Sequence, residues 1–286
     1  MNKTWFLVDS QKKLQRVIDD FDNSSMLSID TEYDSFRYFR EKLCLIQIKA
    51  QGATYIFDPL GNVDLCFLGK YFADRRIVKI LHAADNDIRL LRRDYNFIFE
   101  NIFDTHRAAY LLGFRQLSLE KMINQFLGME LKKSKKMQRS RWDNRPLTDE
   151  QLQYAVQDVT YLPALYQAQL LELDKRGLAE TARGAFTRIA ASNWQEKKID
   201  RRGHTKISGY YSLNQQQKEI LKKIYMWRFQ RAKEENRAIF MFLPDSVLSD
   251  IVQSGDNWRE VLPPEKARLH GDELERIIKD ELREPG

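Results

Sequence analysis

The chain has 286 residues, enough for one large and one small domain or for two of medium size. Hydrophobic residues make up 43% and aromatic residues 12%, which excludes a disordered chain, and the net charge of +6 favours a polyanionic partner. No apolar run approaches the roughly 20 residues that span a bilayer, and the N-terminal residues lack the apolar stretch of a secretory signal. With only two cysteines, and no metal-type spacing between them, we expect a cytoplasmic protein without membrane contact.

The first part of the chain alternates short apolar runs with helix-like stretches. This alternation predicts an α/β or α+β domain built on a sheet. Strands are predicted at 27–30, 43–49, 54–57 and 77–81, and helices at 11–21, 86–93 and 105–112.

The chain is predominantly helical from residue 118 onward. Thr148 can cap a helix in which Gln151 occupies the third position of a capping box, and Pro163 is expected to bend this helix. Residues 195–210 are charged and weakly periodic, as in a linker, and a compact helical unit follows. We therefore predict three parts: a first domain at 1–194, a linker at 195–211 and a helical domain at 212–286.

Two carboxylates end the apolar run that begins at Met26. Asp30 and Glu32 are one residue apart, so in a strand they point to the same face. Taken alone, they are also compatible with solvation where the strand leaves the core.

Three further polar residues suggest a shared site. Tyr154 and Asp158 lie four apart and so share one face of a partly apolar helix, where a carboxylate is costly without a cation or donor opposite. Asp87 opens an amphipathic helix, where it would alternatively serve as an N-cap. Four converging carboxylates would repel one another unless divalent cations lay between them, and oxygen-only ligands suit Mg²⁺ or Mn²⁺.

These residues stand in three ordered motifs, Ile29-Asp30-Thr31-Glu32, His82-Ala83-Ala84-Asp85-Asn86-Asp87 and Tyr154-Ala155-Val156-Gln157-Asp158. Together with flanking stretches such as Phe103-Asp104-Thr105, they resemble the ribonuclease D family, within the DEDDy group of 3′-to-5′ exonucleases. Residues 212–286 resemble an HRDC domain. The resemblance implies an α/β, ribonuclease H-like exonuclease domain, with a mixed sheet flanked by helices, followed by a small all-α HRDC-type domain.

The resemblance also implies a mechanism. Asp30, Glu32 and Asp158 would hold a first Mg²⁺ or Mn²⁺ ion, with Asp30 bridging to a second ion that Asp87 supports. Tyr154 would align the attacking water, and hydrolysis would release nucleoside 5′-monophosphates from a single-stranded RNA 3′ end, with tRNA precursors as expected substrates. No nucleotide cofactor is expected, because no phosphate-binding Gly-rich loop with Lys and Ser or Thr occurs. No oligomer is required.

Two details of the second motif need a choice. Asp85 is an alternative to Asp87, which we prefer because it begins the apolar helix. His82 stands at the spacing from Asp87 that a related exonuclease group uses in its third motif, but it precedes Asp104 and a Tyr-x-x-x-Asp follows later. We therefore expect His82 to be a packed or hydrogen-bonding residue.

A basic segment precedes the third motif. Residues 121–145 carry eight basic and two acidic side chains, a net charge equal to that of the whole chain. The segment is either a solvated loop or a phosphate-binding surface that makes RNA binding salt-dependent. Its candidate nucleic-acid contacts are Lys132, Lys133, Lys135, Lys136, Arg139, Arg141 and Arg145.

Aromatic residues could add base stacking, with Phe36, Tyr38 and Trp142 as candidates, although core packing explains them as well. Lys222, Lys223, Arg228, Arg231 and Lys233 are either an auxiliary RNA-binding face of the helical domain or an ordinary solvated one. Two other functions use the same residues: a DNA exonuclease of the proofreading or repair type, and a nucleic-acid binding module without catalysis. The second would be marked by loss of a carboxylate, and all four are present.

Overall fold

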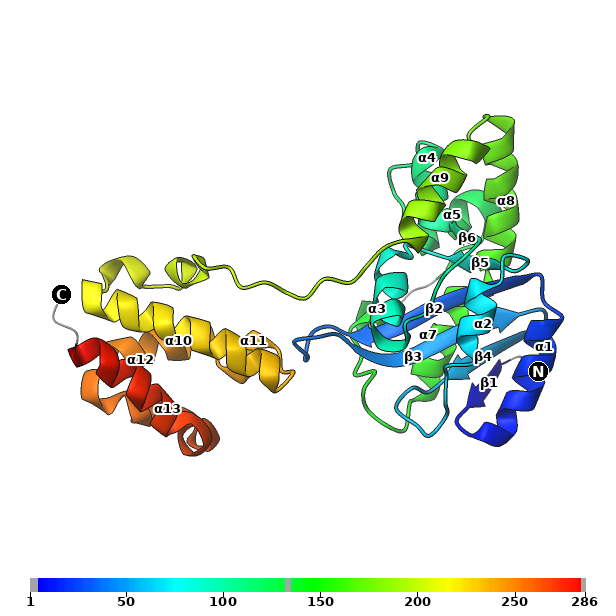
Figure 1. Cartoon of the computed structure of the whole chain (residues 1–286). Coiled ribbons are helices and arrows are strands. Elements are labelled where there is room, and N and C mark those ends of the chain that lie inside the picture. Colours follow the sequence, from blue (N-terminus) through cyan, green and yellow to red (C-terminus); the bar gives the residue numbers. More distant parts are fainter. Residues whose placement is uncertain (1–4, 132–134, 284–286) are drawn as a thin grey trace. The chain divides into compact units, whose positions relative to one another are not determined.

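The structure, a computed structural model, describes residues 5–131 and 135–283 (Figure 1). The chain forms two compact units. The first comprises residues up to Asp34 together with Lys42–Gln195, and the second comprises Ser35–Glu41 together with the residues from Glu196 onward. The second unit thus takes a short segment from inside the first, which the predicted boundaries did not anticipate.

The first unit is built on one sheet of six strands. β2 pairs with β3 and β3 with β4 in antiparallel fashion, whereas β1–β4, β2–β5 and β5–β6 are parallel. The prediction of a mixed sheet is confirmed. The strands, in their order across the sheet, are β1 (Trp5–Val8), β4 (Ala53–Phe57), β3 (Lys42–Ala50), β2 (Met26–Asp34), β5 (Val78–Leu81) and β6 (Ile102–Asp104).

Helices flank this sheet (Figure 1). α7 packs across β2, β3 and β4, while α8 contacts β5 and α9 contacts β6. The helices of the first unit are α1 (Leu14–Asp22), α2 (Leu68–Ala73), α3 (Asp85–Tyr95), α4 (Thr105–Leu111), α5 (Leu119–Leu127), α6 (Lys135–Gln138), α7 (Asp149–Thr160), α8 (Leu162–Lys175) and α9 (Ala179–Ala190).

The two faces of the sheet bury different side chains. Leu27 and Ile29 of β2 pack in the core that also holds Phe21 of α1 and Ile88 of α3. On β3 and β4, Leu45 and Ile56 instead pack with Tyr154 of α7. Because successive residues of a strand point to opposite faces, β2 offers its odd-numbered residues to the first core and its even-numbered residues to the α7 side.

The start of α7 is fixed as the sequence predicts. The Thr148 side chain accepts a hydrogen bond from the Gln151 backbone N–H, and the Gln151 side chain accepts one from the Thr148 N–H. The expected bend at Pro163 is instead a break, because α7 ends at Thr160 and α8 begins at Leu162 with the proline in its first turn.

The second unit is helical throughout the residues that the structure describes, apart from loops. Leu221, Ile224, Leu248 and Leu274 form the centre of its core, and Phe39 of the inserted segment joins them. Ile207 also lies in this core, so part of the predicted linker 195–211 packs with the helical unit. Its helices are α10 (Gln215–Glu234), α11 (Ile239–Phe242), α12 (Asp245–Gln253) and α13 (Pro264–Arg283), with short 3-10 helices at Gly203–Lys206, Tyr210–Ser212 and Gly255–Val261.

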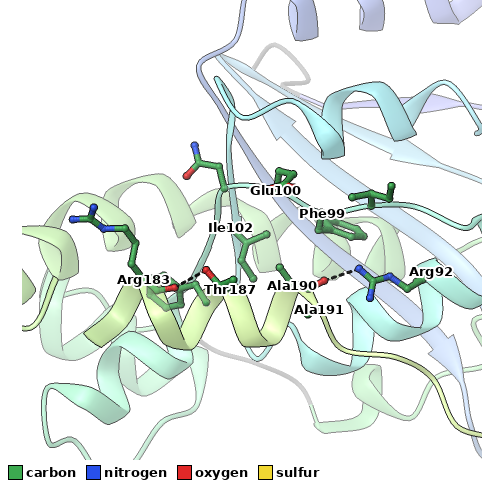
Figure 2. Close-up of a pocket in the computed structure, with 11 residues that line it drawn as sticks. Arg92, Phe99, Glu100, Ile102, Arg183, Thr187, Ala190 and Ala191 are labelled. Carbon is green, nitrogen blue, oxygen red and sulfur yellow. Dashed lines mark hydrogen bonds between the residues drawn. The ribbon is translucent and has the colours of Figure 1, made fainter. Parts of the chain in front are cut away.

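Arg92 ties the end of α9 to α3. Its guanidinium donates to the carbonyl oxygens of Ala190 and Ser192, at 2.7 and 3.0 Å. The Ala190 carbonyl belongs to the last residue of α9 and has no partner within the helix, so the arginine both satisfies it and complements the helix dipole. Figure 2 shows the hydrogen bond from Arg92 to Ala190, and both residues line a pocket of about 270 Å³.

Within the described part of the chain, no helix has the length and apolarity to span a bilayer.

Candidate active site

Asp30 and Glu32 lie at the α7 side of β2, as their even numbers require. Gln47 is the register partner of Asp30 on β3, and its side chain donates to the Asp30 carboxylate at 3.2 Å. A pocket of about 300 Å³ opens over the two carboxylates. Its lining consists of Asp30, Thr31, Glu32, His82, Leu119, Gln138, Tyr154, Asp158 and Leu162.

The third carboxylate comes from α7. Asp158 is 5% exposed, and one oxygen each from Asp30, Glu32 and Asp158 lie within 4.8 Å of one another. Three carboxylates this close are costly without a counter-charge, and their oxygens are the ligands that a hard divalent cation takes. The donor set therefore fits Mg²⁺ or Mn²⁺, and the predicted convergence of these three residues is present in the structure.

Tyr154 lies one helical turn before Asp158 and lines the same pocket. Burial raises the pKa of its phenol far above the usual range, and Asp158, Glu32 and Asp30 raise it further. A phenol with this pKa keeps its hydrogen at physiological pH, so Tyr154 is available in this site as a neutral hydrogen-bond donor.

Asp87 lies apart from this group of three. It sits in the first turn of α3, whose N-cap is Ala84, so the N-cap alternative for Asp87 is wrong. Its carboxylate accepts a hydrogen bond from the Thr31 hydroxyl, and burial raises its pKa to about 7. The Thr31 side chain points to the opposite face of β2 from those of Asp30 and Glu32. Asp87 therefore contacts this strand through the residue between the two carboxylates.

The alternative residue Asp85 is directed elsewhere. Its side chain is about half exposed, accepts a long hydrogen bond from Ser192 at 3.5 Å and lies 3.9 Å from Arg107. Neither Asp85 nor Asp87 is among the residues that line the carboxylate pocket, so the preference for Asp87 stays a prediction.

His82 is a hydrogen-bonding residue, as expected. Thr105 donates its hydroxyl hydrogen to the Leu81 carbonyl at 3.0 Å, so its oxygen accepts from His82 Nδ1, which is 2.8 Å away. This arrangement places the hydrogen of the neutral ring on Nδ1. His82 also lines the carboxylate pocket, which the sequence did not indicate.

Asp104 organises the turn before α3. Its buried carboxylate accepts hydrogen bonds from the backbone N–H groups of Ala83, Ala84 and Arg107, at 3.2, 2.8 and 2.9 Å. The sequence pointed to Asp104 through the motif flank Phe103-Asp104-Thr105, but it did not indicate what Asp104 does. The geometry assigns it to fixing the backbone that carries Asp87.

The basic segment contains exposed residues and residues that form ion pairs or hydrogen bonds within the protein. Lys132 and Lys133 lie outside the described residues, as does the side chain of Lys135. Lys136 and Arg139 are exposed, and Arg141 pairs with Asp143 at 3.1 Å. The prediction for Arg145 needs correction, because its guanidinium is bound by Asp58 at 2.6 Å and by the Cys44 carbonyl at 2.8 Å, which makes it a structural anchor.

Trp142 is a core residue and not a base-stacking one. It is 2% exposed, and its ring centroid lies 6.0 Å from that of Tyr154.

Gln138 of α6, which sequence reasoning missed, lines the carboxylate pocket and hydrogen-bonds Tyr154 through its side chain. A lone glutamine within a basic run carries no pattern that could have revealed this contact.

The pocket beside Arg92 has a different character. Its lining includes Arg183, Glu100 and Thr187, and Figure 2 shows these side chains around its rim. In the described part of the chain, the group Asp30, Glu32 and Asp158 brings together the acidic ligands for a metal ion, and none of these lines the pocket at Arg92.

A mixed sheet that carries clustered carboxylates beside a tyrosine is compatible with a nuclease domain, and comparison with known proteins supports this class. The model of a 3′-5′ exonuclease family matches residues 6–174. The chain therefore belongs to this 3′-5′ exonuclease family, and the predicted hydrolase class is confirmed at this level.

The relatives that match this chain include exosome components and ribonucleases D. The chain is 30% identical to a fruit fly protein named exosome complex component 10 homolog, over 87% of the chain and 28% of that relative. It is 29% identical to a ribonuclease D from Desulfotalea psychrophila, over 86% of the chain and 66% of that relative. The chain thus spans only about a quarter of the length of the exosome-component relatives.

Solved structures support the fold. The catalytic core of RRP6 from Trypanosoma brucei has a TM-score of 0.83 at 23% identity, covering 98% of this chain and 80% of that one. Escherichia coli RNase D has a TM-score of 0.72 at 22% identity, covering 100% of this chain and 76% of that one. At these identities the likeness concerns the fold alone.

Proposed function

We propose that this protein is a 3′-to-5′ exoribonuclease that removes nucleotides from an RNA 3′ end and releases nucleoside 5′-monophosphates. One observation carries the proposal: oxygens of Asp30, Glu32 and Asp158 lie within 4.8 Å of one another in the part of the chain that matches a 3′-5′ exonuclease family. RNA as the substrate is supported by relatives named for ribonuclease activity and for the exosome.

Asp30, Glu32 and Asp158 would hold divalent cations, with Mg²⁺ or Mn²⁺ favoured by the all-oxygen donor set. Bound ions of this kind supply a polarised water and stabilise charge on a leaving oxygen. Asp87 would support this arrangement from behind, since its hydrogen bond to Thr31 fixes the strand between Asp30 and Glu32.

The protein's own residues then position the reaction. Tyr154 donates its hydrogen bond to the attacking water, which forms a new bond to phosphorus. The bond from phosphorus to the 3′ oxygen of the preceding nucleotide breaks, that oxygen takes up a proton, and the terminal nucleotide leaves as a 5′-monophosphate. No covalent link to the protein forms.

The exposed cations of the basic segment would bind the RNA backbone. Lys136 and Arg139 flank Gln138, which lines the carboxylate pocket, so phosphate contacts here lie beside the site. Each such contact releases counterions, and binding should weaken as salt rises.

We further propose that the second unit is an HRDC-type helical domain that assists RNA binding. The basic face predicted on α10 gives little support, because Arg228 is buried against Asp245 and Arg231 pairs with Glu273. Better support comes from Phe36 and Phe240, which are 61% and 49% exposed with ring centroids 5.0 Å apart. Exposed aromatic rings of this kind suit stacking with unpaired bases.

The test is digestion of a 3′-extended tRNA precursor with Mg²⁺ or Mn²⁺, followed by sizing of the products, beside matched single-stranded RNA and DNA. The proposal expects stepwise shortening from the 3′ end, release of 5′-monophosphates and faster turnover of RNA. Faster degradation of DNA would favour the proofreading or repair type of exonuclease. Tight binding without turnover would point to a binding module.

A further inference from the structure

Gln138 reaches the carboxylate pocket from outside the three sequence motifs. It is the last residue of α6, within the basic segment, and it lines the pocket together with Asp30, Glu32, Tyr154 and Asp158. Its side chain hydrogen-bonds the Tyr154 phenol. A divalent cation binds carboxylates in preference to a neutral amide, and this site already offers three carboxylates. The function of Gln138 is therefore to be sought in its contact with Tyr154.

The residues after Gln138 are firmly attached to the body of the domain. The Gln151 side chain, besides capping α7, donates to Ser140 Oγ at 2.9 Å and to the Arg141 carbonyl at 3.3 Å. Arg145 closes the segment at its far end through Asp58. From Ser140 onward, segment 138–145 is therefore held against α7, and at Arg145 it is held against Asp58 and the Cys44 carbonyl of β3.

This segment contacts Tyr154 at two points. The Trp142 ring packs beside the tyrosine ring, with centroids 6.0 Å apart, and Gln138 meets the hydroxyl group at its tip. One contact fixes the plane of the ring and the other fixes the position of the oxygen. A side chain held in this way loses little entropy when the reaction requires one orientation.

Hydrogen-bond chemistry sets the direction of the Gln138 contact. A glutamine amide offers two N–H donors and one acceptor, while the phenol offers one donor and accepts through its oxygen. If the phenol hydrogen is directed into the pocket, the phenol oxygen is left to accept, and an N–H of the Gln138 amide is the donor that suits it. With its oxygen occupied by Gln138, Tyr154 is left to donate its own hydrogen into the pocket.

We propose that Gln138 is a positioning residue for Tyr154, holding the phenol oxygen so that the hydroxyl hydrogen points to the attacking water. Because Lys136 and Arg139 lie on either side of Gln138 in the chain, phosphate binding by the basic segment and alignment of the tyrosine involve the same short stretch. The inference rests on the proposed function, since it assumes that Tyr154 orients the water.

The experiment is steady-state and single-turnover hydrolysis of a 5′-labelled single-stranded RNA with Mg²⁺ or Mn²⁺. Gln138→Met removes the amide at similar length, and Gln153→Met is the matched control, since Gln153 is exposed on α7 one residue before Tyr154. We expect Gln138→Met to lower kcat about fivefold to tenfold, the effect of one hydrogen bond, with KM within about twofold. Gln153→Met should behave as wild type.

A double variant separates positioning from an independent effect. If Gln138 acts through the tyrosine hydroxyl, Gln138→Met should cost nothing further, within about twofold, in a Tyr154→Phe background. An equal loss in both backgrounds would overturn the inference, as would an unchanged kcat. A raised KM at constant kcat would identify Gln138 as an RNA contact instead. If wild type itself releases no nucleotides, the proposed function fails, which is a different outcome.

A readout without metal or turnover completes the test. Tyrosine labelled with ¹³C at Cζ reports the hydrogen bonds of each phenol, and the Tyr154 signal is identified by its absence in Tyr154→Phe. The signal should shift in Gln138→Met and stay in place in Gln153→Met. An unshifted Tyr154 signal in Gln138→Met would show that the two side chains do not interact and would overturn the inference.

Discussion

Thr31 donates its hydroxyl hydrogen to the carboxylate of Asp87, and this bond joins strand β2 to helix α3. Thr31 is buried, and its side chain points to the opposite face of the strand from those of its neighbours Asp30 and Glu32. The second motif thus supports the first through the residue that separates the two carboxylates.

This bond predicts the effect of Thr31→Val. The change keeps the shape of the side chain but leaves the buried Asp87 carboxylate without its donor, so unfolding free energy should fall by about 1–3 kcal/mol. Urea denaturation measures this loss, and Thr31→Ser, which retains the hydroxyl, should recover most of it. A Thr31→Val variant as stable as wild type would mean that Asp87 does not depend on this donor.

The three clustered carboxylates should be individually essential. Asp30→Asn and Asp158→Asn each remove one negative charge from the group that lies within 4.8 Å. We expect hydrolysis with Mg²⁺ to fall by about 10²-fold or more in each variant, because the charge that develops at the phosphate loses its support.

RNA binding gives the control for these carboxylate variants. Affinity measured without metal should stay within about twofold of wild type or improve, since removing a negative charge does not weaken attraction for phosphate. Near-normal hydrolysis by either variant would show that the metal-holding residues are assigned incorrectly.

Much of the site follows from local sequence periodicity. The alternation of β2 places Asp30 and Glu32 together, the helical spacing places Tyr154 with Asp158, and the capping box fixes where α7 begins. These relationships span at most a few residues, so the sequence contains all that is needed to predict them.

Other features depend on contacts between distant parts of the chain. The sequence did not predict strands β1 and β6, of four and three residues, which lie at the two edges of the sheet and pair with β4 and β5. The insertion of Ser35–Glu41 into the second unit rests on contacts such as Ala238 N–H to the Arg37 carbonyl at 2.9 Å. No local pattern reveals a pairing between residues about 200 positions apart.

Arg145 and Arg139 should respond differently to substitution, although both lie in the same basic segment. Arg145→Met breaks the contact with Asp58 and should lower stability by about 1–3 kcal/mol. Arg139→Met removes an exposed cation, so stability should stay within about 0.5 kcal/mol while RNA affinity falls and its salt dependence becomes less steep by about one unit.

Urea denaturation and RNA titrations at several salt concentrations separate the two arginines. If Arg139→Met left the salt dependence unchanged, this position would not contact phosphate. If Arg145→Met kept full stability while losing affinity, Arg145 would be an RNA contact and not a structural anchor.

Asp104 should matter for folding of the turn that precedes α3. Asp104→Ala removes the acceptor of three backbone N–H groups, two of them in the turn at Ala83 and Ala84. We expect a loss of about 2–4 kcal/mol in unfolding free energy, as for other buried hydrogen-bonded carboxylates. Asp174→Ala is the control at an exposed acidic residue in the last turn of α8, and a loss no larger than that of the control would contradict the role of Asp104.

Lys79 of β5 predicts a dependence of stability on alkaline pH. Its side chain is fully buried, and its ammonium donates to the carbonyls of Asp74 and Ile77 at 2.7 and 2.8 Å. Burial lowers its pKa from 10.5 to about 8 despite the nearby Asp74 and Glu100 carboxylates. Between pH 8 and pH 10 the folded chain therefore releases this proton while the unfolded chain still holds it, so the contribution of Lys79 to stability rises with pH, by about 2 to 3 kcal/mol.

In Lys79→Met this rise should be absent, whereas Lys12→Met, at an exposed position, should keep it. The measurement is the free energy of unfolding in urea at pH 7, 8, 9 and 10 for the three proteins, compared as differences so that other titrating groups cancel. Parallel curves for wild type and Lys79→Met would show that Lys79 does not titrate in this range.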